Sequence, residues 1–166
     1  MQRLLFIFIL TVVFQTGIAQ SKAEVYAGVL LHLVKYVEWT ESQNKAINIG
    51  IVNDPKLVDA LNTIVKKKNI QFKNIGITKL NVVDTTGELN VLFLAKKQAY
   101  LCSRVNSFAC NKKILVITEM KAKELVCPSI NFFEEQGKLK FEIYTSVMDK
   151  CGLQVSDQLK RFAVLK

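Results

Sequence analysis

Two apolar stretches decide the fold of this chain: Val91-Leu92-Phe93-Leu94-Ala95 and Ile114-Leu115-Val116-Ile117. A continuous apolar run of this kind is typical of a strand that is covered on both faces of a sheet. Between the two runs, residues 97–108 are predicted to form a helix whose apolar residues share one side. Strands that alternate with helices in this way favour an α/β sheet with helices on both faces.

The residues before these strands extend the same pattern. Apolar residues recur at helical spacing over Ala23–Trp39, which predicts a long and nearly completely buried helix. Residues 47–51 alternate between isoleucine and small or polar residues, as a strand does. Asp54-Pro55 then opens a second helix with a cap and an N1 proline, and residues 74–83 are predicted to form another strand.

The C-terminal part is predicted to contain an antiparallel hairpin. Strands over residues 130–134 and 138–145 are joined across Glu135-Gln136-Gly137. In the second strand Leu139, Phe141 and Ile143 alternate with Lys138, Lys140 and Glu142. One face of this strand is therefore expected to be buried and the other wet. A last helix is predicted after a cap at Ser156 or Asp157, with a packed face of Val155, Leu159, Phe162 and Ala163. Residues 20–166 are expected to form a single domain.

The N-terminus indicates export. Arg3 precedes the eleven residues Leu4–Phe14, of which only Thr11 is polar, and small residues follow. This arrangement is typical of a secretory signal peptide, and we expect cleavage between Ala19 and Gln20. The alternative is a membrane anchor, but spanning needs about 20 apolar residues. Residues 1–19 are therefore predicted to be a signal peptide, and the mature protein is expected to be periplasmic and not membrane-spanning.

Composition and charge exclude several classes of protein. Of the 166 residues 50% are hydrophobic and 22% are charged, which excludes an intrinsically disordered chain. The formal net charge of +9 falls to +8 when Arg3 is removed with the signal peptide. The positive charge is dispersed and mostly lysine, and export removes the protein from nucleic acid. We therefore expect no nucleic-acid partner.

The sequence contains no recognisable catalytic set. His32 is the only histidine, and it lies inside the most apolar predicted helix, which favours a structural role over that of a catalytic base. The four cysteines lack the spacing of a zinc site, and there is no glycine-rich phosphate loop. We predict no enzyme, no metal and no cofactor, with an exported enzyme as the least favoured alternative.

An even number of cysteines in an exported chain indicates disulfides. Four cysteines allow three connectivities. Cys102 and Cys110 can pair only if the chain reverses after about Phe108, and Cys127 and Cys151 flank the predicted hairpin. We favour Cys102–Cys110 with Cys127–Cys151 as structural bridges. A labile, redox-sensing bridge is the alternative.

Tyr36 and Trp39 are the candidate contact residues for a ligand or partner. Trp39 is the only tryptophan, and with Tyr36 it could line a pocket near the ends of the strands. The alternative for Trp39 is an anchor that caps the core at a helix end, which is the more common use of such a residue.

The ordered set of segments resembles the YfiR family of small exported bacterial proteins. VYAGVLLHLVKYVEW (25–39) is similar to the opening helix of that family and INIGIVND (47–54) to its first strand. NVLFLA (90–95), followed by ILVIT (114–118), is similar to the central strand of the family. The tail has the elements INF (130–132), GKLKFEI (137–143) and GLQVS (152–156) followed by Leu159, in the order in which the family has them.

The resemblance implies a three-layer α/β/α sandwich with a mostly parallel sheet and a regulatory role without catalysis. Relatives of this type bind the periplasmic domain of a membrane-bound diguanylate cyclase in cyclic-di-GMP signalling and hold it inactive. A lipoprotein antagonist relieves that block, and a homodimer is a further expectation. The alternative function is a periplasmic domain that senses a small molecule and feeds another receptor.

Overall fold

The computed structural model describes residues 21–39, 46–67, 74–81, 87–120 and 128–166. The predicted signal peptide and its cleavage site lie outside these residues, and so does Cys127. Among the helices of the described residues, none combines the length and the apolar character that crossing a membrane requires.

A mixed sheet forms the centre of the structure. Within the described residues seven strands lie in the order β3-β2-β4-β5-β6-β7-β9. Neighbours from β3 to β6 are parallel, β7 is antiparallel to β6, and β9 is parallel to β7. The strands are β2 (Ala46–Val52), β3 (Asn74–Leu80), β4 (Val91–Leu94), β5 (Leu115–Glu119), β6 (Ile130–Glu135), β7 (Lys138–Ile143) and β9 (Val164–Leu165). The predicted mostly parallel sheet with a C-terminal antiparallel hairpin is confirmed.

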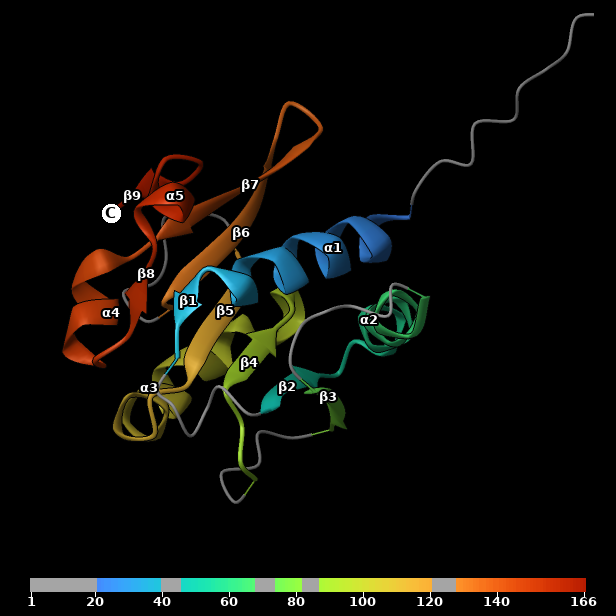
Figure 1. Ribbon diagram of the computed structural model, residues 1–166, viewed down its shortest axis with the longest axis horizontal. Helices are drawn as coiled ribbons and strands as arrows, with labels where there is room; N and C mark the ends of the chain where they lie inside the picture. The colour runs from blue at the N-terminus through green and yellow to red at the C-terminus, as the bar shows by residue number, and fades with distance from the viewer. Residues whose placement is uncertain (1–20, 40–45, 68–73, 82–86, 121–127) are drawn as a thin grey trace, which may run out of the picture.

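Helices cover both faces of this sheet, as predicted (Figure 1). The helices are α1 (Lys22–Lys35), α2 (Pro55–Lys67), the 3-10 helix η1 (Lys96–Leu101), α3 (Cys102–Asn111), α4 (Thr145–Lys150) and α5 (Asp157–Lys160). The larger core joins α1 and α2 to side chains such as Phe93 and Ile117, and the smaller core joins α3 to Leu92 and Val116. Successive side chains of one strand thus pack into the cores on opposite faces of the sheet. This explains the continuous apolar runs in the sequence.

The hairpin between β6 and β7 has a two-residue turn. Glu135 pairs with Lys138, and the residues between them have positive φ, 51° at Gln136 and 70° at Gly137. Positive φ at both central residues defines a type I′ turn, whose twist matches that of the flanking strands. Glycine at the second position adopts this conformation without a steric cost.

Helix α1 is shorter than the sequence predicts. It begins at a capping box formed by Ser21 and Glu24 and ends at Lys35, four residues before Trp39. After Tyr36 the chain becomes strand β1 (Val37–Glu38), which pairs with β8 (Gln154–Val155) in a separate two-stranded sheet. A pairing with residues more than a hundred positions away is not visible in the local pattern. The helix predicted from periodicity is therefore too long at its C-terminal end.

The C-terminal segment also departs from its prediction. Ser156 is the N-cap of α5, as expected, but α5 ends at Lys160 and does not include Phe162. The chain then turns to form β9, and the backbone N–H of Lys166 donates to the Ile143 carbonyl at 2.9 Å. Phe162 is 75% exposed, so the prediction that its side chain belongs to a packed helix face is wrong.

Candidate functional site

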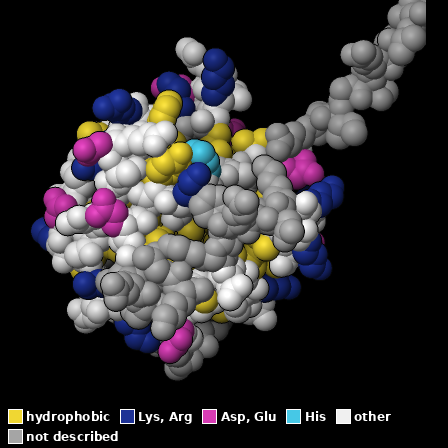
Figure 2. Space-filling view, in the orientation of Figure 1, with side chains coloured by type: hydrophobic (Ala, Val, Ile, Leu, Met, Phe, Trp, Pro, Cys, Tyr) yellow, Lys and Arg dark blue, Asp and Glu magenta, His cyan; other side chains and the backbone are white. Residues whose placement is uncertain are grey.

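An apolar groove of about 430 Å³ opens between α1, β7 and the segment around α5. Helix α1 contributes Gly28, Val29, His32 and Tyr36 among its lining residues. The opposite wall includes Phe141, Leu159 and Phe162. Figure 2 shows the histidine, in cyan, between hydrophobic side chains and a positively charged one.

Two residues leave the groove open to solvent: an exposed phenylalanine at its edge and a glycine in the middle of α1. Phe162 places a large apolar ring in solvent at the edge of the groove. Gly28 lies in the middle of the 14-residue helix α1, and a Cβ added there would meet no described atom within 4 Å. Large apolar surfaces that remain open in a monomer mark binding sites more often than chance. The groove is therefore the candidate functional site.

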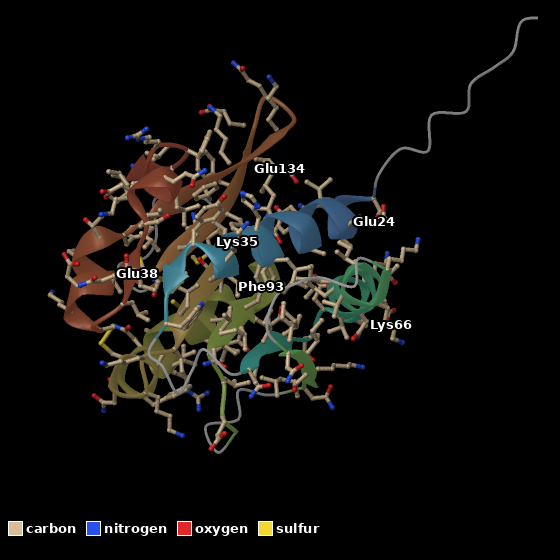
Figure 3. All side chains as sticks on the ribbon, viewed as in Figure 1. Glu24, Lys35, Glu38, Lys66, Phe93 and Glu134 are labelled. Carbon is tan, nitrogen blue, oxygen red and sulfur yellow. A yellow bond between two sulfur atoms is a disulfide. The ribbon has the colours of Figure 1, made fainter. Side chains whose placement is uncertain are left out.

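A lysine and a histidine contact the Tyr36 ring, which lines the groove. The ammonium of Lys35 lies 5.8 Å from the centre of the Tyr36 ring. The ring of His32 packs edge-on against the same tyrosine, with centroids 4.8 Å apart. Arg161 is exposed and directly precedes Phe162. Figure 3 places Lys35 at the C-terminal end of α1.

The two predicted contact residues lie in different places. Tyr36 is half-buried and lines the groove, as a contact residue would. Trp39 is only 9% exposed and belongs to the larger core. Its Nε1 donates at 2.9 Å to the Val34 carbonyl, one of the carbonyls that the end of α1 leaves without a helical partner. This groove therefore includes Tyr36 without Trp39, and the alternative of Trp39 as a core anchor describes the structure.

A charged cluster fastens the start of α1 to the ends of β5 and β6. The Lys22 ammonium lies 2.8 Å from a carboxylate oxygen of Glu119 and 2.8 Å from one of Glu134. The Tyr26 hydroxyl donates to Glu119 at 3.2 Å. These contacts raise the pKa of Lys22 and lower the pKa of Glu134. Burial, followed by the negative charge of Glu119, raises the pKa of Tyr26 to about 12. Since the charges pair with one another, the cluster attaches the start of α1 to the sheet.

A second polar network is buried beneath the C-terminus. Glu142 is 3% exposed, and its carboxylate accepts from Asn131 at 3.2 Å and from the Tyr144 hydroxyl at 3.1 Å. The Lys166 ammonium lies 3.5 Å from its other oxygen, and Asn131 accepts from Thr118 at 2.9 Å. Burial and the nearby carboxylate raise the pKa of Tyr144 to about 12. The expectation of Glu142 on a wet face is wrong, because the chain end covers it.

The disulfide connectivity corrects the favoured prediction. Cys110 is bonded to Cys151, with 4.4 Å between their Cα atoms. This bond excludes both Cys102–Cys110 and Cys127–Cys151. The reason is that α3 runs on from Cys102 through Asn111, so no reversal brings Cys102 and Cys110 together. A continuous helix holds two such residues about 12 Å apart. Cys102 is itself disulfide-bonded.

Among the described residues, no group of three or more histidine, cysteine, aspartate or glutamate side chains could hold a metal ion. His32 lies exposed on α1, where its ring contacts Tyr36 at the groove. Its placement in the groove was not foreseen from the sequence, and neither were those of Gly28 and Phe162. One signal was available: glycine inside a strongly periodic helix is costly and therefore calls for a reason.

The fold is a small α/β domain with helices on both faces of its sheet and an apolar groove beside α1. The sequence pattern of the YfiR/HmsC-like family matches residues 23–164, so the chain belongs to that family. Members of this family are periplasmic regulators of signalling and are regulatory rather than enzymatic. No curated protein matches the chain at a significant level. The family resemblance predicted from the ordered motifs is thereby confirmed.

Proposed function

We propose that the mature protein is a periplasmic regulator that binds the periplasmic domain of a membrane-bound signalling protein and holds it inactive. The signalling protein is a diguanylate cyclase or a similar enzyme, so the regulated quantity is cyclic-di-GMP in the cytoplasm. A lipoprotein antagonist that competes for the regulator would relieve the block.

The observation that carries this proposal is the apolar groove in a protein of a regulatory family. A groove bordered by a solvent-exposed aromatic ring fits the aromatic anchors that dominate protein–protein interfaces. The proposal also depends on export by residues 1–19, since the partner domain is on the periplasmic side.

The experiment measures cyclic-di-GMP in cells that lack the protein and in cells complemented with it. Loss of the protein should raise cyclic-di-GMP, and the full-length chain should restore the low level. The matched control lacks residues 2–19 and is retained in the cytoplasm, where it should not restore the low level. Unchanged cyclic-di-GMP on deletion, or equal repression by the cytoplasmic control, would refute the proposal.

A second candidate is a small-molecule sensor, favoured by the size of the groove. A volume of about 430 Å³ falls within the range of roughly 300–1,000 Å³ that ligand pockets occupy. A ligand in the groove would raise the melting temperature of the purified protein by mass action. If no compound of a broad metabolite panel shifts the melting temperature, this second candidate fails while the first remains.

A further inference from the structure

We infer that the outer face of η1 and α3 docks on the anionic phospholipid surface of a membrane. This face presents a row of exposed residues that we call the α3 stripe: Lys97, Tyr100, Arg104, Ser107 and Asn111. The inference goes beyond the proposed function, because it concerns lipid and a face of the molecule that does not line the apolar groove.

The spacing of the α3 stripe places its side chains on one side of the two helices. Residues three apart eclipse in a 3-10 helix, and residues three or four apart are neighbours on the surface of an α-helix. The other side of η1 and α3 carries the buried residues Ala99, Cys102, Val105 and Ala109. Cys102, Val105 and Ala109 belong to the smaller core, across the sheet from α1 and α2. The α3 stripe therefore points away from the sheet into solvent.

The charge of this segment is positive throughout. Residues 89–118 contain five lysine and arginine residues and no aspartate or glutamate. Lys97 and Arg104 are exposed, and neither side chain forms an ion pair within the part of the chain that the structure describes. Helix α2 differs, since Asp59 is exposed among its lysines. Unpaired cations attract an anionic lipid surface, and each strengthens binding by about fivefold.

The composition of the α3 stripe favours lipid over an acidic protein. Tyr100 is 70% exposed and lies about one helical turn from both Lys97 and Arg104. Tyrosine combines an apolar ring with a polar hydroxyl and is enriched where a membrane meets water. The stripe offers no second apolar side chain, whereas a specific protein interface has a core of several. Binding to phospholipid headgroups needs chiefly the positive charge.

Docking is tested by co-sedimentation of the purified protein with lipid vesicles. Vesicles of phosphatidylcholine alone are compared with vesicles of equal parts phosphatidylcholine and phosphatidylglycerol, an anionic phospholipid. At low ionic strength we expect at least tenfold stronger binding to the anionic vesicles. This binding should be lost in about 1 M salt, where charges are screened beyond about 3 Å.

A pair of double variants locates the binding surface. Lys97→Gln with Arg104→Gln should weaken binding to the anionic vesicles about 25-fold, the product of two fivefold losses. The matched control, Lys56→Gln with Lys66→Gln, removes two exposed cations from α2 on the other face of the sheet and should bind as the wild type does. Tyr100→Ser should weaken binding several-fold without a change of charge. The changed side chains are exposed, so the melting temperatures should stay those of the wild type.

Equal binding to the two kinds of vesicle overturns the inference. An equal loss in the two double variants also overturns it, because the attraction would then belong to the net charge of the whole protein. Binding of polyglutamate without binding of anionic vesicles overturns it in favour of an acidic protein partner. None of these measurements involves a cyclase, so the proposed function can fail while the α3 stripe still binds lipid.

Discussion

Removing the Cys110–Cys151 bond should destabilise the protein by about 4 kcal/mol. The bond closes a segment with a sequence separation of 41. Constraining a loop of that length in the unfolded chain corresponds to about 4 kcal/mol at room temperature in the chain-entropy description. The bond joins α3 to the residue that caps α4, so it also fixes two elements that no strand pairing connects.

The assay is urea unfolding of the double variant Cys110→Ala with Cys151→Ala beside the wild type. With a urea dependence of about 2 kcal/mol/M for a chain of this size, the midpoint should fall by about 2 M. Non-reducing peptide mapping of the wild type serves as the control and should give one fragment that contains both cysteines. A destabilisation below about 1 kcal/mol would refute the reasoning, because loss of the two sulfur atoms alone accounts for that much.

Three further changes test other parts of the structure. Burial raises the pKa of Tyr26 and Tyr144 to about 12 from an ordinary value of 10, so their contribution to stability is complete below pH 10 and declines between pH 10 and 12. Urea unfolding over that pH range should show the decline, and phenylalanine at both positions should make it smaller, with the raised pKa of Lys22 accounting for a remainder. Trp39→Phe removes the donor to a carbonyl at the end of α1 and should cost about 1–3 kcal/mol, measured by circular dichroism during urea unfolding. A cost below about 0.5 kcal/mol would contradict the anchoring role. Asp54→Ala removes the carboxylate that caps α2 and should cost about 1 kcal/mol by calorimetry, whereas the exposed mid-helix change Asp59→Ala should change stability by less than about 0.5 kcal/mol.

The layers of the fold could be predicted because they depend on local patterns. The apolar runs around Phe93 and Val116 indicate strands with cores on both faces, and the structure places them at the centre of the sheet. Asp54-Pro55 predicts the start of α2, and the Asp54 carboxylate does accept from the backbone N–H of Leu57 at 3.1 Å. Cap, turn and periodicity signals act over a few residues, so one sequence suffices to read them.

Most of the errors concern contacts between distant segments. The carboxylate of Glu142 is buried because the chain end folds over it, and Lys166 stands 24 positions further on. Cys110 pairs with Cys151 across a sequence separation of 41, a proximity that local spacing does not encode. Alternation along β7 predicted a wet face correctly for Lys138 and Lys140 up to the point where β9 covers the strand.

The groove, too, is formed by segments that are distant in the sequence. Its walls come from α1, β7 and the residues around α5, which periodicity assigns to separate elements without placing them together. Tyr36 is the residue of the predicted pocket near the strand ends that does line the groove. Phe162 was assigned to a packed face because apolar residues usually are, and only the short length of α5 leaves it exposed.

The small sheet of β1 and β8 has a consequence for the speed and cost of binding. Val37 pairs with Val155, and the N–H of Ser156 donates to the Tyr36 carbonyl at 2.9 Å. These bonds tie the end of α1 to the residue that caps α5, so the two walls of the groove are held at a fixed separation. A preorganised receptor pays little conformational entropy when its ligand arrives. Association at the groove should therefore resemble rigid docking, with any ordering cost carried by the molecule that binds there.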